Sequence, residues 1–210
     1  MNIKVFFDPI CPWCFLGKRR LERALELRPA IQATITWRPF MLNPDMPAGG
    51  MEREAYLLHK FGSQTRVRRL LGALELMGAS EEIPFSFHRI VQTPSTVGAH
   101  RLVHYAEDFG RDGAVVDTLF RAYFQDGRDI GSIDILSEIG RESGLDGGPL
   151  DAFLDSETDT EWVYKENTRA HRLGVNGVPC FLFDGELALQ GAQPPAILTR
   201  MLDAAASLAA

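Results

Sequence analysis

The sequence lacks the features by which membrane-spanning and nucleic-acid-binding proteins are recognised. Its 210 residues contain no apolar run close to the roughly 18 residues that cross a bilayer. Lys and Arg number 22 against 28 Asp and Glu, a formal net charge of −6, whereas nucleic acids and anionic membranes attract basic surfaces. The opening residues lack the apolar segment of a secretory signal. We therefore expect a cytoplasmic protein whose partners include neither nucleic acid nor membrane.

Cysteine is also scarce. Three cysteines are too few for a disulfide scaffold, and their odd number leaves one without a partner. With 45% hydrophobic and 24% charged residues, the chain can build a full core without covalent staples. The positions of the cysteines are therefore informative: Cys11 and Cys14 form a C-x-x-C, and Cys180 directly follows Pro179.

The two ends of the chain show the pattern of an α/β protein. At the N-terminal end, residues 3–7 and 33–40 are rich in β-branched and aromatic residues and predict strands, with an amphipathic helix over 12–27 between them. At the C-terminal end the pattern predicts a turn leading into an apolar strand over 175–183, a returning strand over 187–190 and a closing helix over 194–208.

Between these ends, about a hundred residues show mostly helical periodicity with short breaks. The predicted helices of this block cover 53–62, 63–77, 96–109, 113–126, 133–143 and 150–158, and a further helix over 159–173 follows the block. Without this block the chain reads β-α-β followed by α-β-β-α, which is the order of a thioredoxin-like core. We predict a thioredoxin-like α/β fold made of residues 1–50 and 159–210, with an inserted all-helical domain over 51–158.

The C-x-x-C lies where a helix begins, and this position suggests its chemistry. Cys11 meets the unpaired N–H groups and the positive dipole end of the helix, and both favour a thiolate. Cys14 lies one turn further in and is expected to be more buried. We therefore predict that Cys11 is the exposed nucleophile, which forms mixed disulfides, and that Cys14 resolves them.

A C-x-x-C is also half of a zinc site, which would need a second pair of Cys or His ligands. The only His pair at close spacing is His100 and His104, and His residues at that spacing are more often surface or packing residues. A redox pair is the better interpretation, and we expect no metal site.

A second signal lies near the other end of the chain, at Val178-Pro179. A proline at the mouth of an apolar strand, opposite the helix that begins the C-x-x-C, favours a cis peptide bond. Such a bond would present the backbone of Val178 to an extended substrate. We take Pro12, Trp13, Val178 and Pro179 as candidate substrate-binding residues.

Several segments resemble the DsbA-like thiol–disulfide oxidoreductases of the FrnE type, over nearly the whole chain. The matching segments are Asp8-Pro9-Ile10-Cys11-Pro12-Trp13-Cys14-Phe15-Leu16-Gly17-Lys18-Arg19-Arg20-Leu21, Phe40-Met41-Leu42-Asn43-Pro44, Ala99-His100-Arg101-Leu102, Leu119-Phe120-Arg121-Ala122-Tyr123-Phe124 with Asp129-Ile130, Gly174-Val175-Asn176-Gly177-Val178-Pro179 and Gly191-Ala192-Gln193. The resemblance implies a thioredoxin fold with a helical insertion, a redox pair at Cys11 and Cys14, and a cis-proline at Pro179.

The sequence departs from that family at Cys180, where the residue after the cis-proline is usually aromatic or aliphatic. Cys180 is either a small buried hydrophobe, as most free cysteines are, or an accessory thiol that exchanges with the Cys11–Cys14 pair. His100 is a second accessory candidate, since its helix could face the substrate cleft.

Two other functions remain open. The first is that of the glutathione-dependent isomerases, including 2-hydroxychromene-2-carboxylate isomerase, and the kappa-class glutathione transferases. These enzymes share the fold and the helical insertion that the resemblance implies, but they typically carry serine where Cys11 stands. A thiol-dependent chaperone or binding module that uses the helical block is the other alternative. We expect protein or small-molecule thiols as partners and no required cofactor, with glutathione as a candidate substrate or redox partner. Related folds often dimerise, so a homodimer is also consistent with the resemblance.

Overall fold

The computed structural model describes residues 1–208 of the chain and divides it into two compact units. One unit combines Met1–Leu42 with the segment from Tyr164 onward, and the other is Asn43–Val163. The predicted domain limits, 1–50 with 159–210 and 51–158, stay a prediction. Within residues 1–208, no helix has both the length and the apolar character needed to cross a membrane.

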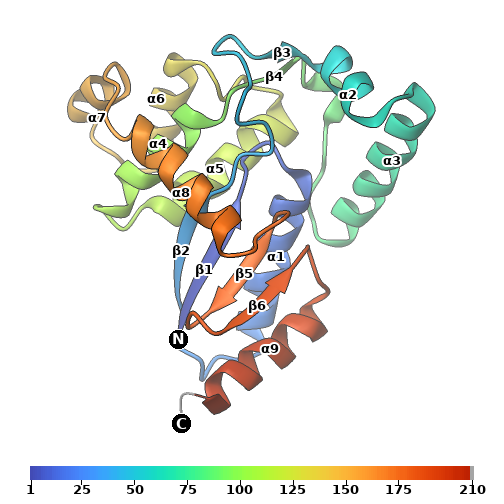
Figure 1. Cartoon of the computed structure of the whole chain (residues 1–210), viewed down its shortest axis with the longest axis vertical. Helices are drawn as coiled ribbons and strands as arrows, with labels where there is room; N and C mark the ends of the chain where they lie inside the picture. The colour runs from blue at the N-terminus through green and yellow to red at the C-terminus, as the bar shows by residue number, and fades with distance from the viewer. Residues whose placement is uncertain (209–210) are drawn as a thin grey trace. The chain divides into compact units, whose positions relative to one another are not determined.

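The first unit is built on a four-stranded sheet in the order β2-β1-β5-β6, as Figure 1 shows. Strand β1 (Asn2–Phe7) pairs in parallel with β2 (Thr34–Pro39) and antiparallel with β5 (Cys180–Phe183), which pairs antiparallel with β6 (Leu187–Gln190). Helix α1 (Pro12–Glu26) connects the two parallel strands, and α9 (Pro195–Leu208) follows β6 and packs against α1. The strands and helices predicted for the two ends of the chain are confirmed.

The two faces of this sheet pack against different partners because successive side chains of a strand point to opposite sides. On one face, Phe181 of β5 lies against α1 at Gly17. On the other face, Phe6 of β1 pairs with Cys180 of β5. This second face is covered by a cluster that includes Ala170 from α8 (Thr160–Arg172). The sheet therefore has α1 and α9 on one side and the end of α8 on the other.

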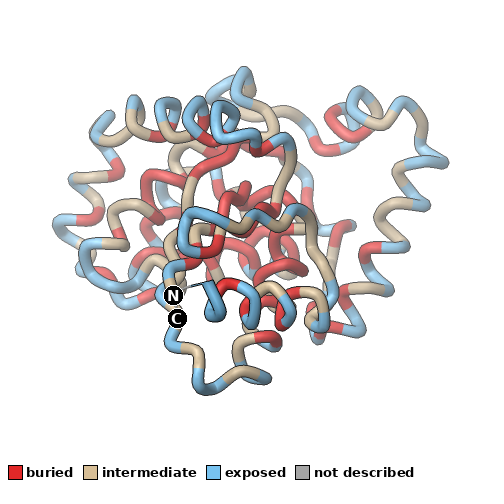
Figure 2. The backbone as a smooth tube through the Cα atoms, turned by 60° about the horizontal axis from the view of Figure 1, so that its bottom comes forward, coloured by how far each residue is buried: buried red, intermediate tan, exposed pale blue. Residues whose placement is uncertain are grey.

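The second unit consists mainly of helices around an aromatic core. Its helices are α2 (Arg53–Phe61), α3 (Gln64–Ser80), α4 (Val97–Glu107), α5 (Asp112–Arg121), α6 (Ile133–Glu142) and α7 (Gly147–Leu154), together with the short 3₁₀ helix η1 (Phe87–Arg89) and the first turn of α8. Phe120, Tyr123 and Phe124 are fully buried here. Figure 2 draws the buried residues of each unit in red and the exposed ones in pale blue.

Three details of the second unit differ from the sequence prediction. A two-stranded sheet, β3 (Met51–Glu52) with β4 (Gln92–Thr93), was not predicted, because two-residue strands carry no periodicity. The helix predicted over 113–126 is α5 followed by a π-helical turn, η2 (Ala122–Asp126). Helix α7 begins before residue 150, because the carboxylate of Asp146 accepts the N–H of Gly148 and caps it.

Candidate active site

Cys11 is the residue that opens α1. Its backbone is extended, its N–H donates to the carbonyl of Asp8 over 2.9 Å, and its carbonyl accepts the N–H of Cys14 over 2.9 Å. Pro12 occupies the first helical turn, where its missing N–H leaves no partner unsatisfied. The thiol therefore stands at the positive end of the helix, as the sequence predicts.

The prediction that Cys11 is exposed is wrong, because only 4% of the residue is accessible. Its Sγ lies 3.8 Å from the carbonyl oxygen of Val178, at the start of the segment that enters β5. This loop therefore covers the thiol. Pro12 and Trp13, which follow Cys11 at the start of α1, are half-buried.

Cys14 lies one turn further along α1 and is buried. Burial raises the pKa of its thiol well above the ordinary value, because a thiolate is poorly solvated there. A hydrogen bond with the Cys11 side chain and the electrostatic interaction with Cys11 raise this pKa further. A hydrogen bond with the Asp8 backbone lowers it. The two thiols of the C-x-x-C are therefore in contact, with Cys14 on the inner side.

Asp8 is a site residue that was not among the candidates taken from the sequence. Its carboxylate is fully buried and accepts the backbone N–H of Ile10 over 3.2 Å and that of Leu42 over 2.7 Å. It thus ties the loop before Cys11 to the segment that follows β2. Its negative charge also contributes to raising the pKa of Cys14. An acidic residue between Phe7 and Pro9, directly before the motif, was the available signal.

The Val178–Pro179 peptide bond is cis, as the sequence predicts. The proline packs against α1 at Gly17, where a Cβ would stand 2.6 Å from Pro179 Cγ. Only the absence of a side chain at this position lets the helix and the loop come so close. The structure therefore brings Cys11, Cys14, Val178 and Pro179 together.

Cys180 points away from this arrangement. Its neighbour Phe181 faces α1, so the Cys180 side chain lies on the opposite face of the sheet. There it is 2% exposed and belongs to an apolar cluster with Phe6 and Phe40. Burial raises the pKa of its thiol to about 11. These surroundings favour the interpretation of Cys180 as a small core residue.

His100 is buried in α4, in the second unit of the chain, and its accessory role stays a prediction. The ring of His104 stacks on Trp162 with 3.6 Å between ring centroids. Across residues 1–208 no group of three or more His, Cys, Asp or Glu side chains is placed to hold a metal ion.

Comparisons with known proteins give a consistent result. The family model described as a DSBA-like thioredoxin domain matches residues 2–203. A crystal structure of a probable DsbA oxidoreductase from Streptomyces coelicolor is 30% identical, with a TM-score of 0.90 over 99% of this chain and 90% of that one.

Two more distant structures share the fold. The cytosolic disulfide reductase DsbM from Pseudomonas aeruginosa, solved with GSH, is 20% identical, with a TM-score of 0.70 over 97% of this chain and 98% of that one. A 2-hydroxychromene-2-carboxylate isomerase is 18% identical, with a TM-score of 0.72 over 100% of this chain and 96% of that one. The thioredoxin-like α/β fold predicted from the sequence is thereby confirmed.

Proposed function

Because the chain belongs to the family of DSBA-like thioredoxin domains, we propose that it is a thiol–disulfide oxidoreductase of the FrnE type that works through Cys11 and Cys14. The observation that carries the proposal is the contact between the two thiols at the start of α1, where Cys11 stands at the helix terminus and Cys14 lies one turn further in with a raised pKa. This asymmetry separates an attacking thiol from a resolving one, which is what a C-x-x-C needs for two-step exchange.

The exchange proceeds in two balanced steps. The Cys11 thiolate attacks one sulfur of a substrate disulfide, the substrate S–S bond breaks, and the departing sulfur leaves as a thiolate that takes up a proton. Cys14 then loses its proton and attacks Cys11 Sγ, which forms the Cys11–Cys14 disulfide and releases the second substrate thiol. Two electrons and two protons pass to the substrate, and the same steps in reverse oxidise a dithiol.

The surroundings assign roles to the other site residues. The high pKa of Cys14 keeps it a thiol while Cys11 reacts, and the Asp8 carboxylate holds the loop that carries Cys11. We assign Pro12 and Trp13, half-buried beside Cys11, and the Val178-Pro179 segment to substrate contact. The chemistry requires no cofactor.

Glutathione is the small-molecule thiol that we propose as redox partner. DsbM, which has the same fold, is named as a cytosolic disulfide reductase and was solved with GSH. A cytoplasmic location for this chain is in keeping with that description.

The test is a reduction assay with insulin as the disulfide substrate and glutathione as the electron donor. Wild type is expected to be active and Cys11→Ser inactive. Cys14→Ser is expected to accumulate a mixed disulfide that mass spectrometry detects. Cys180→Ala is the matched control, because it removes a thiol on the opposite face of the sheet.

Other results would replace the proposal. An inert wild type that isomerises an aromatic cis-alkene acid only with glutathione would establish the isomerase function instead, since a 2-hydroxychromene-2-carboxylate isomerase shares the fold. Suppression of protein aggregation that survives Cys11→Ser, without any redox activity, would establish the chaperone function.

A further inference from the structure

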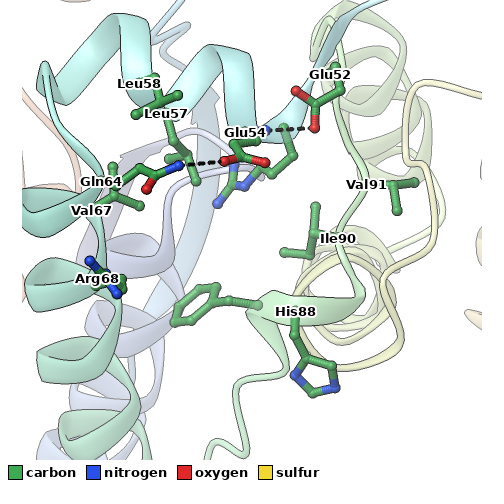
Figure 3. A pocket seen from close by; sticks show the side chains of 12 residues that line it. Glu52, Glu54, Leu57, Leu58, Gln64, Val67, Arg68, His88, Ile90 and Val91 are labelled. Atoms are coloured by element: carbon green, nitrogen blue, oxygen red, sulfur yellow. Dashed lines mark hydrogen bonds between the residues drawn. The ribbon is translucent and has the colours of Figure 1, made fainter.

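A cavity lies wholly within the unit Asn43–Val163 and contains none of the cysteines. Its volume of about 480 Å³ is within the range of known ligand sites. Figure 3 shows it between the α2–α3 corner on one side and η1 with the following chain on the other. Its lining residues are Glu52, Arg53, Glu54, Leu57, Leu58, Gln64, Val67, Arg68, Phe87, His88, Ile90 and Val91.

The middle of this cavity is apolar. Leu57, Phe87 and Ile90 are buried in the protein yet line the cavity, and Val67 of α3 is half-buried beside them. Val91 stands at the opening with 70% of its surface exposed. Apolar surface of this kind gains free energy when another apolar group covers it.

Figure 3 shows Glu52 and Glu54 at one end of the cavity and Arg68 and His88 at the other. The lining also includes Arg53, which is buried and whose guanidinium donates to the hydroxyl groups of Thr93 and Tyr123. At one end, Glu52 accepts two backbone N–H groups at the start of α2, which lowers the pKa of its carboxyl and keeps it charged. Glu54 beside it accepts the side-chain amide of Gln64 over 3.0 Å. Both carboxylates are therefore held in place, and each retains further acceptor positions.

At the other end stand Arg68 of α3 and His88 of η1, both exposed. Among residues 1–208 neither side chain forms a hydrogen bond or an ion pair. Their donors are therefore available to an acidic group that enters the cavity.

We propose that this cavity binds a segment of an unfolded polypeptide, with a large apolar side chain in the middle, a basic group at Glu52 and Glu54, and an acidic group at Arg68 and His88. A polypeptide segment supplies all three features through successive side chains. Unfolded chains also expose the apolar side chains that folded proteins bury. The inference goes beyond the proposed function, since the binding involves no thiol.

The test is calorimetric titration of the full-length protein at low salt with a blocked, cysteine-free peptide. The peptide carries Phe at its centre, Lys on one side and Glu on the other, with Gly and Ser elsewhere. Val67→Asp is expected to weaken binding about tenfold, because it places a charge in the apolar middle. Arg68→Glu is expected to weaken it about threefold or more, and a peptide with Lys in place of Glu is expected to restore the loss.

Arg69→Glu is the matched control, because it makes the same charge change on the neighbouring exposed arginine, outside the cavity. Equal affinities for the Arg68→Glu and Arg69→Glu variants would overturn the proposal, as would the absence of binding by wild type. So would a wild-type dimer that Val67→Asp, but not Arg69→Glu, dissociates in sedimentation velocity, because a second copy would then fill the cavity. Cys11→Ser is expected to bind the peptide like wild type, which separates this proposal from the redox function.

Discussion

Gly17→Ala tests whether the contact between α1 and the Pro179 loop shapes the active site. The new Cβ would stand 2.6 Å from Pro179 Cγ and 3.2 Å from Phe181 Cζ. The first distance is about 0.8 Å short of ordinary van der Waals contact, which begins at 3.4 Å. Pro179 is buried and its ring cannot rotate away from the new Cβ, so the loop and the helix must move apart.

The magnitude follows from two opposing terms. Alanine in place of glycine inside a helix stabilises it by about 1 kcal/mol, while overpacking a buried contact costs about 1–3 kcal/mol. We therefore expect the free energy of unfolding of Gly17→Ala to fall by about 1 kcal/mol. The exchange rate is expected to fall by about tenfold or more, because the displaced loop carries the Val178 carbonyl that contacts Cys11, and errors near 1 Å are costly in catalysis.

Gly72→Ala provides the comparison. Gly72 lies within α3, and a Cβ there has no atom within 4 Å. The same substitution therefore adds only the higher helix propensity of alanine. We expect this variant to be about 1 kcal/mol more stable than wild type and to exchange disulfides at an unchanged rate. Urea denaturation measures the stabilities, and insulin reduction measures the rates.

A Gly17→Ala variant that gains as much stability as Gly72→Ala and reduces insulin at the wild-type rate would contradict this prediction. In that case the close approach of α1 and Pro179 would not exist in solution.

Three further predictions concern buried polar groups. Asp8→Asn is expected to lower the free energy of unfolding by about 1–3 kcal/mol in urea denaturation, because one buried backbone N–H loses its acceptor; unchanged stability would contradict the contacts to Ile10 and Leu42. Arg101→Met is expected to cost about 2–3 kcal/mol by the same assay, since the guanidinium donates to three carbonyls at and beyond the end of α7, and Arg141→Met on the exposed side of α6 serves as its control. The pKa of the Cys180 thiol rises from 9.0 to about 11 on folding. The unfolding free energy of wild type relative to Cys180→Ala is therefore expected to be constant below pH 9 and to decline as the pH rises from 9 to 11, because the thiol of the unfolded chain ionises first. A pH-independent difference in unfolding free energy between the two proteins would refute this.

Local sequence signals predicted the elements that carry the candidate site. The β-branched and aromatic run before Asp8 predicts β1, and Pro12 with the apolar spacing that follows predicts α1. Both are confirmed because strong periodicity and a helix-start residue agree there. The signals failed where pairing partners are far apart: β3 and β4 are only two residues each, and their pairing joins positions about forty residues apart.

The burial of the site residues could not be predicted from neighbouring residues in the sequence. Cys11 was expected to be exposed, yet the loop before β5 covers it, and that loop is distant in the sequence. Asp8 gave no local sign that both its carboxylate oxygens bind backbone groups, one of them at Leu42.

The sequence by itself determined the C-x-x-C at a helix start, the proline before a buried strand and the order of the strands and helices in the first unit, because each depends on residues that are neighbours in the chain. Only the tertiary structure decided which groups surround each thiol. It placed the Val178 carbonyl against Cys11, the Asp8 backbone within hydrogen-bonding reach of Cys14, and Cys180 on the far face of the sheet. The physical reason is that burial and electrostatic environment are set by segments that meet only when the sheet pairs β1 with β5.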